Sequence, residues 1–538
     1  MNVTVGSGPP SLARGAAVIT LATAASRVTG FIRVIVVAAA MGTTFLANTY
    51  QTANTAPNVI FELVAAGVLT SIFVPTFVEY LVKGEEKEGW DAANALTSVA
   101  LVGLIVIGGL LALAAPLIMR VLTIGVNDAA LRDEEVELGS TFLRLFAPQV
   151  IFYGAGMIMT GALHARRRFA LAAVAPIFSN LVVIGTYLLY ASMRGNRPPS
   201  VQGITSGEVL VLGIGTTLGV VAMTVVLIPQ LVRLGWHFRF RFDPRHPAVK
   251  RGARLGVWAL GYAGGYQAGL IVVLVLANKV EGGVAAYQWA YTFFYLPHAL
   301  FAAPIFSVLF TAMSEHVARK EEGQLLVRMR DGLRMLGFVL LPMAATLVAL
   351  AQPLSQVTLQ YGVMTPAGAE LVGRVLLAFA VGLPMYSSFL VFTRGFYALG
   401  DTKTPTLVNA GTVVVSSVAG VVLFNALPEG WEVAGLAFGH SLGFALGAIV
   451  LGRTFHVRVG STRSAALRTS LLRTTTIAIG ALLAMLAVSR VMEGTSKSAA
   501  FTELAVAGLA GAVFYFAAMM MLKTPELKQL RRILPGAS

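Results

Sequence analysis

Two arginines lie inside the first long apolar stretch of the chain. Arg27 follows Arg14 by 13 residues, which places it ~20 Å along a helix, and Arg33 lies closer to the other end. Charged side chains in such a stretch usually face a cavity or a partner, and a guanidinium matches phosphate oxygens in a bidentate fork. The pair therefore predicts a site for an anionic ligand, with Gly30 as a hinge between them. The alternatives are a structural ion pair for Arg27 and snorkelling for Arg33.

The second apolar stretch carries amides and one carboxylate. Asn48, Asn54, Asn58 and Glu62 are predicted to line the same site, and Pro57 is predicted to act as a hinge because it lacks a backbone donor. Glu62 is the one carboxylate placed at mid-membrane. It could be the counter-ion of the deeper arginine, a proton carrier or part of a plain salt bridge. The first two asparagines could instead join neighbouring helices.

The second half of the chain offers an aromatic, uncharged patch. Gln288 and Thr292 are predicted to contact the head group of a ligand, and Pro297 is predicted to be a further hinge. An interfacial aromatic belt or simple packing is the alternative. His298 and His440 could relay protons, although isolated histidines are more often hydrogen-bonded packing residues.

The sequence contains no motif for nucleotide binding, metal binding or catalysis. The sequence contains no P-loop, metal-ligand cluster or nucleophile–base constellation, and it has no cysteine. It therefore predicts no cofactor, no metal site and no enzymatic activity. A fixed positive charge in a cavity points to a transported or bound anion.

The elements that must position these residues are membrane helices. Of 538 residues, 56% are hydrophobic and 12% charged, half the charged share of a soluble protein. Because ~20 apolar residues span a bilayer, the apolar blocks predict an all-α membrane protein of about fourteen spans. The blocks are 16–42, 47–80, 92–119, 138–163, 170–192, 207–232, 252–278, 284–314, 333–352, 370–393, 405–427, 433–452, 471–490 and 500–522.

Basic residues fix the predicted orientation. With both termini in the cytoplasm, 29 of the 40 Lys and Arg residues fall in inner segments and 8 in outer ones. This asymmetry follows the positive-inside rule, and it suits contact with anionic membrane lipids. The Arg-rich run 233–254 could suggest nucleic acid, but no soluble domain accompanies it, so no nucleic-acid partner is predicted.

The chain also repeats itself weakly at a spacing of about 230–240 residues. Pro176-x-x-x-Asn180 matches Pro405-x-x-x-Asn409, and Tyr50-Gln51 matches Tyr287-Gln288, in the same order. Parallel repeats of this kind can rock about a central cavity. The predicted domains are a tail (1–13), an N-lobe of six helices (14–233), a cytoplasmic linker (234–251), a C-lobe of six helices (252–455), two further helices (456–522) and a cytoplasmic tail (523–538).

Several motifs together resemble a known family, the MurJ/MviN lipid II flippases of the MOP transporter superfamily. They are Ser26-Arg27-x-x-Gly30-x-x-Arg33, Pro57-Asn58, Val74-Pro75, and Gly395-Phe396-Tyr397 with Asp401-x-Lys403-Thr404-Pro405. The resemblance covers about residues 14–525 and looks most like actinobacterial members. It implies two lobes in a V around a central cavity, Arg27 and Arg33 on a pyrophosphate, and a groove for a polyprenyl tail at the last two helices.

The chain departs from that family at four places. Phe61-Glu62 and Tyr291-Thr292 stand where many members have an Arg pair and an Asp-Arg pair, and Asn48 replaces an acidic residue. The carboxylates of a sodium site have no counterpart in spans 7 and 11. The head-group contacts therefore differ in detail, and the resemblance supplies no metal site.

The resulting prediction is a flippase that moves lipid II from the cytoplasmic to the outer leaflet of the bacterial inner membrane. It is predicted to be a monomer, with lipid II, anionic lipids and proteins of cell-wall synthesis as partners. A multidrug or polysaccharide-lipid exporter of the same superfamily is one alternative, with Glu62 as its cavity carboxylate. A non-transporting scaffold of cell-wall synthesis is the other.

Overall fold

The computed structural model describes most of the chain as two compact units, Met1–Gln267 and Ala268–Ser538. The residues it describes exclude 1–8, 65–85, 167, 237, 246–248, 250–263, 266, 463, 493, 495, 525 and 527–538. Every element within the described part is a helix, which confirms the predicted all-α fold. The predicted lobe boundary falls beside residues outside the described part.

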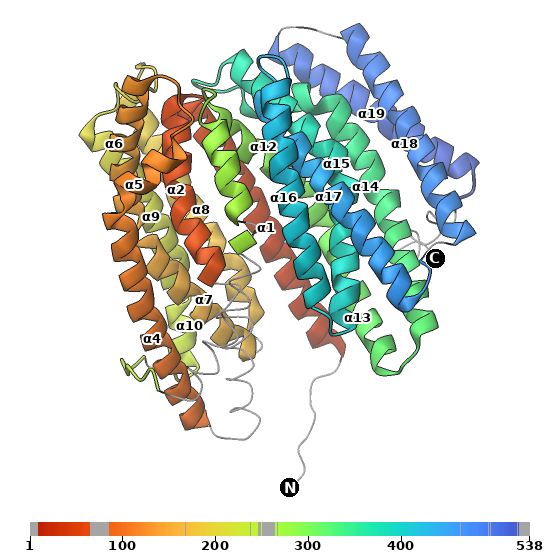
Figure 1. The fold of residues 1–538 in the computed structure, drawn as a ribbon, viewed down its shortest axis with the longest axis horizontal. Helices are drawn as coiled ribbons and strands as arrows, with labels where there is room; N and C mark the ends of the chain where they lie inside the picture. The colour runs from red at the N-terminus through yellow and green to blue at the C-terminus, as the bar shows by residue number, and fades with distance from the viewer. Residues whose placement is uncertain are drawn as a thin grey trace. The chain divides into compact units, whose positions relative to one another are not determined.

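The first unit is a bundle of nine labelled helices in its described part (Figure 1). They are α1 (Pro9–Met41), α2 (Phe45–Val64), α4 (Glu86–Leu113), α5 (Ala115–Leu122), α6 (Ala129–Phe146), α7 (Gln149–Ala165), α8 (Phe169–Arg194), α9 (Ser206–Val225) and α10 (Ile228–Arg233). α8 packs against both α1 and α9, and α2 packs mainly on α6. The arginine-bearing helix is thus held by α8, and the amide-bearing helix by α6.

Two predicted spans of this unit are broken. The block 92–119 ends as a helix at Leu113 and resumes at Ala115, with Pro116 in the first turn of α5. The block 138–163 is divided at Pro148 and begins nine residues earlier, at Ala129. Proline fits the first turn of a helix but removes a backbone donor from its interior, so it favours a new start at both places.

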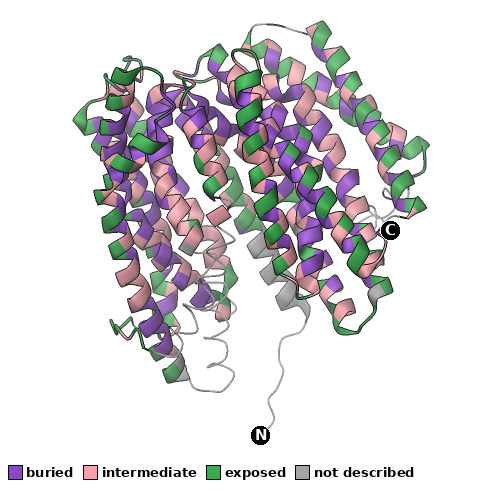
Figure 2. Ribbon diagram, in the orientation of Figure 1, coloured by how far each residue is buried: buried purple, intermediate pink, exposed green. Residues whose placement is uncertain are grey.

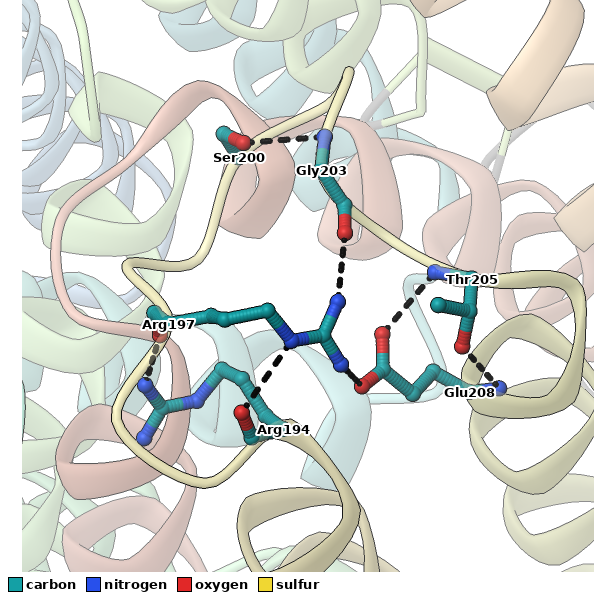
Figure 3. Close-up of polar contacts among 6 residues, drawn as sticks. All are labelled: Arg194, Arg197, Ser200, Gly203, Thr205 and Glu208. Carbon is teal, nitrogen blue, oxygen red and sulfur yellow. Dashed lines mark hydrogen bonds and ion pairs between the residues drawn. The ribbon is translucent and has the colours of Figure 1, made fainter.

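The connection between α8 and α9 is closed by one ion pair (Figure 3). The Arg197 guanidinium pairs with Glu208, and it also donates to Gly203 O at 2.9 Å and Arg194 O at 3.3 Å. Glu208 Oε2 accepts from Thr205 N at 2.9 Å and so completes a capping box at the start of α9. The side chain of Glu208 is buried, and its charge is therefore balanced locally.

The segment after α10 lies against α4. Trp236 donates from Nε1 to Asn94 Oδ1 at 3.0 Å and stacks on Trp90, while Arg241 N donates to Ser98 Oγ at 2.8 Å. The first part of the predicted linker 234–251 is therefore fixed to the first unit.

The second unit contains nine labelled elements in its described part. They are α12 (Gly283–Pro297), the π-helix η2 (His298–Ala302), α13 (Ala303–Ala318), α14 (Glu322–Leu359), α15 (Pro366–Ala398), α16 (Lys403–Ala426), α17 (Glu432–Val459), α18 (Ala465–Met492) and α19 (Lys497–Met521). A short apolar helix, Gln267–Ala277, precedes them. Among the candidate membrane spans of this unit, α15 and α17 are the most buried (Figure 2), because α14, α16 and α12 pack around them.

The last two helices pair with each other and with α14 (Figure 1). Tyr515 of α19 donates its hydroxyl to Phe338 O of α14 at 2.7 Å, in a core that also contains Ile477 and Met485 of α18. Eleven helices of the described residues are long and apolar enough to cross a membrane. The predicted total of fourteen spans remains a prediction.

Candidate functional site

Arg27 lies on an exposed part of α1, next to a polar joint with α8. Asn180 of α8 donates from Nδ2 to Thr29 Oγ1 at 3.0 Å and to Ser26 O at 3.3 Å. A Cβ placed on Gly30 would lie 3.5 Å from the same Nδ2 atom. The joint therefore holds the backbone on both sides of Arg27 while its side chain projects from the packed surface.

Arg33, two turns further along α1, is half-buried and lies within electrostatic range of three tyrosine hydroxyls. These are Tyr50 of α2, Tyr153 of α7 and Tyr187 of α8. Tyr50 is fully buried, and its hydroxyl lies 3.1 Å from that of Tyr187 and 2.5 Å from Thr216 Oγ1. A half-buried guanidinium suits an anion, because it can donate hydrogen bonds to it, whereas the Tyr50 hydroxyl is already bonded to its neighbours.

The amides of α2 divide into two kinds. Asn48 is completely buried, which favours a joint between helices. Asn58 donates from Nδ2 to Asn54 O at 2.9 Å on its own helix. Asn54 Oδ1 is buried and has no hydrogen-bond partner among the described residues. Of the three, Asn54 thus keeps an acceptor for a ligand or a water molecule.

Glu62 is exposed, and it lies beyond Pro57 on the same helix. Gln267, the last residue of the first unit, donates from Nε2 to Glu62 Oε2 at 2.5 Å. Gln267 itself is buried, and its Oε1 has no hydrogen-bond partner in the described part of the chain. The carboxylate is therefore anchored by a neutral amide. The hinge roles of Gly30 and Pro57 remain predictions.

In the second unit, Gln288 and Thr292 lie one turn apart on α12, and Thr292 Oγ1 donates to Gln288 O at 3.1 Å. Both side chains are partly buried. Pro297 ends α12, and the π-helix η2 follows it directly. A π turn is rare and often marks a functional position. The hinge role of Pro297 remains a prediction.

The two histidines of this unit are enclosed by aromatic rings. His298 Nδ1 lies 2.9 Å from Ser387 Oγ, and its side chain is buried. The ring of His440 contacts five aromatic rings, and neither of its nitrogens has a hydrogen-bond partner among the described residues. The five are Tyr291, Phe294, Phe379, Tyr386 and Phe444. Packing therefore dominates this patch.

Asn180 and Glu135 were not predicted as site residues. Asn180 belongs to the internal repeat, and its counterpart Asn409 is also buried. The repeat is therefore the sequence signal that could have identified Asn180. Glu135 lies before the predicted span 138–163, yet its side chain is fully buried in α6.

Within the described residues, no group of three or more His, Asp or Glu side chains could hold a metal ion.

A largely apolar cavity of about 560 Å³ lies within the second unit. α14, α15, α17 and α18 line it, and Met385, Phe392 and Leu471 are among its apolar residues. Arg453 and His456 of α17 also line the cavity. Its wall therefore includes α18, one of the two helices predicted to form a groove for a lipid tail.

Comparison with known proteins extends over most of the chain. The family described as "Lipid II flippase MurJ" matches residues 37–506. A probable lipid II flippase MurJ of Rhizobium tropici is 30% identical over 442 residues, 81% of this chain and 79% of that protein. The lipid II flippase MurJ of Burkholderia cenocepacia is 25% identical over 438 residues, 79% of this chain and 80% of that protein.

Solved structures show the same fold. A lipid II flippase MurJ in an inward closed conformation has a TM-score of 0.75 at 18% identity, covering 94% of this chain and 99% of that one. An inward-facing multidrug resistance MATE family transporter of the MOP superfamily has a TM-score of 0.66 at 15% identity, covering 82% and 96%. At these identities the likeness establishes the fold alone.

Proposed function

Since the chain belongs to the MurJ family of lipid II flippases, we propose that it carries lipid II from the cytoplasmic to the outer leaflet by alternating access. Membership in this family makes it a multi-pass bacterial membrane transporter and not a catalytic enzyme. The direction of transport, the access mechanism and the cytoplasmic location of both termini are parts of the proposal.

The arginine-bearing face of the first unit carries this proposal. Arg27 projects from the joint between α1 and α8, and the half-buried Arg33 lies within electrostatic range of the hydroxyls of Tyr50, Tyr153 and Tyr187. Lipid II bears an anionic pyrophosphate, and guanidinium and hydroxyl groups both donate to phosphate oxygens. We assign Arg27 to the first contact with the pyrophosphate and Arg33 to a later contact, nearer the other end of α1.

The neutral groups of the site suit the remainder of the head group. Asn54 Oδ1 in the first unit is a buried acceptor with no partner among the described residues, and a sugar hydroxyl or peptide N–H can donate to it. Gln288 and Thr292 of the second unit are assigned to the same class of polar contact. Asn48 is fully buried and Asn58 donates to its own helix, so they are assigned a supporting role.

The exporter alternative depends on Glu62. A cation exporter needs a carboxylate that binds the drug or a proton, and Glu62 is held at 2.5 Å by the Gln267 amide. The sequence family favours the flippase, while the likeness to MATE transporters concerns the fold. Efflux of organic cations that is lost in Glu62→Gln would support the exporter.

The decisive experiment replaces Arg27 in cells depleted of their own lipid II flippase. We expect Arg27→Ala to abolish rescue and to lower lipid II in the outer leaflet at least tenfold, because a bidentate contact to phosphate contributes more than about 1.4 kcal/mol, a factor of ten. Arg27→Lys should restore part of the activity, since it keeps the charge but loses the fork.

Arg144→Ala is the matched control, because Arg144 is an exposed arginine in a candidate span of the same unit. It should transport normally. Wild-type transport by Arg27→Ala, at equal protein level in the membrane, would refute the assigned role. Rescue by a chain that moves no lipid II would instead support the scaffold alternative.

A further inference from the structure

Glu135 lies on the face of α6 that packs against α2. It shares a helical stripe with Gly139, Phe142 and Phe146, and all four are buried. Tyr50 of α2 packs edge-on against the two phenylalanine rings. A Cβ on Gly139 would lie 3.2 Å from the methyl group of Thr49, so the two helices are in close contact here.

The hydroxyl of Thr49 lies between two oxygens. Thr49 Oγ1 is 2.8 Å from Phe45 O, one turn earlier on α2, and 3.1 Å from Glu135 Oε1. A hydroxyl has one hydrogen and two lone pairs, and a backbone carbonyl only accepts. The shorter contact, to Phe45 O, takes the hydroxyl hydrogen of Thr49. The contact with Glu135 is then a hydrogen bond only when the carboxyl group donates to Thr49 Oγ1. An ionised carboxylate cannot donate, whereas a carboxylic acid can.

The surroundings of the Glu135 carboxyl group also favour the neutral carboxylic acid. Its side chain has no exposed surface, and Oε2 has no hydrogen-bond partner among the described residues. An ionised carboxylate without a partner costs several kcal/mol in such a place, and the neutral acid costs far less. Within the described part of the chain, no ion pair involves Glu135.

The helices packed on α6 supply no compensating cation. The only described ionisable residues of α2 are Tyr50 and Glu62, and Arg120 of α5 is exposed. The charges of α4 lie within its first six residues, and Glu208 of α9 is paired with Arg197. On α6 itself the remaining ionisable residues are Arg132, Asp133, Glu134, Glu137 and Arg144.

We propose that Glu135 is a proton-binding site of the first unit. At neutral pH it carries a proton as the neutral acid and donates it in a hydrogen bond to Thr49 Oγ1. When α2 and α6 part, water reaches the carboxyl group, its O–H bond breaks, and the carboxylate and a hydrated proton result. Separation of these two helices is thereby linked to proton release. This site is independent of the substrate assigned above.

Infrared spectroscopy of the whole protein in lipid bilayers tests the proposal without any substrate. At neutral pH the wild type should show the C=O band of a protonated carboxylic acid, and Glu135→Gln should remove that band. Glu137→Gln is the matched control, because Glu137 lies two residues further on the same helix and is exposed. It should leave the band unchanged.

Two further variants keep the test decisive. Thr49→Val removes the acceptor, so the band should persist but shift in frequency. Glu135→Gln should melt like the wild type, because an amide also donates to Thr49, whereas Glu135→Ala should melt lower. A wild type without an acid band at neutral pH, or a band that survives Glu135→Gln, would overturn the proposal. So would an unshifted band in Thr49→Val.

Discussion

Glu526 illustrates how one buried carboxylate can join several helices. It follows α19 and is almost fully buried, with Arg334 Nε at 2.5 Å from Oε1 and Arg473 Nη2 at 3.1 Å from Oε2. Ser470 of α18 also donates to it. Three groups from α14 and α18 therefore converge on one carboxylate, and they hold Glu526 against these two helices.

We predict that Glu526→Gln lowers the melting temperature. Burial raises the pKa of Glu526, but the hydrogen bonds from Ser470 and Arg334 outweigh it, and its pKa lies below the ordinary value. The stabilisation is thus complete above about pH 4.3 and is lost as the pH falls through the folded-state pKa. Melting measured from pH 7 to pH 3 should show this loss in the wild type and not in Glu526→Gln.

Glu429→Gln serves as the control, because Glu429 is an exposed carboxylate of the same unit. It should melt like the wild type across the pH range. An acid-induced loss that persists unchanged in Glu526→Gln would show that other carboxylates are responsible.

Charge alone singles out two residues of the first helix, whose roles remain predictions. Arg27 and Arg33 stand out in an apolar stretch, and the structure places both on α1. Glu135 was not predicted because it lies among four other ionisable residues at the polar start of α6. Its buried carboxyl group contacts Thr49, which is 86 residues away in the chain. The residues next to Glu135 in the sequence do not indicate that contact.

At the scale of elements, α16 and α17 illustrate how small residues bring helices together. Gly435, Gly439, Gly443 and Gly447 recur at every fourth position of α17. A Cβ on Gly439 would lie 2.6 Å from Gly420 Cα and 2.7 Å from Ser416 O, both on α16. Such rows allow close backbone approach between membrane helices.

Gly439→Ala should therefore destabilise the second unit by about 1–3 kcal/mol, as expected for overpacking against backbone atoms. The measurement is the melting temperature of the purified protein in detergent or lipid. Gly411→Ala is the matched control, because a Cβ there meets no atom within 4 Å and the residue is exposed. It should leave the melting temperature unchanged or slightly higher, since alanine favours helix. Equal effects of the two substitutions would contradict close packing at Gly439.

Helix positions were predictable to within a few residues where the apolar block is bounded by charge. The block 170–192 became α8 (Phe169–Arg194), and 405–427 became α16 (Lys403–Ala426). The break at Ala114 was not predicted, because both sides of it are equally apolar and the only local signal is Pro116. Interruptions depend on backbone geometry, which hydrophobicity does not report.

At the scale of the whole molecule, the absence of cysteine allows a direct test of orientation. A single cysteine at Asn196, in the α8–α9 connection, should react with a membrane-impermeant maleimide on intact cells. One at Thr402, before α16, should react only after the membrane is opened. Both positions are exposed, so the difference should report the side of the membrane. The reverse pattern would contradict the orientation assigned from the basic residues.

The π-helix after Pro297 has a consequence for the two helices that it joins. A π turn holds one residue more than an α turn, and each residue advances the helix by about 100°. The side-chain stripes of α12 and α13 are therefore out of phase by that angle across His298–Ala302, although the helical rod is continuous. A shift of the wide turn by one position would change the direction of the side chain that it passes, while α12 and α13 would keep the same relative phase. The missing N–H of Pro297 lies next to this wide turn, so a side chain near it could be redirected without turning either helix.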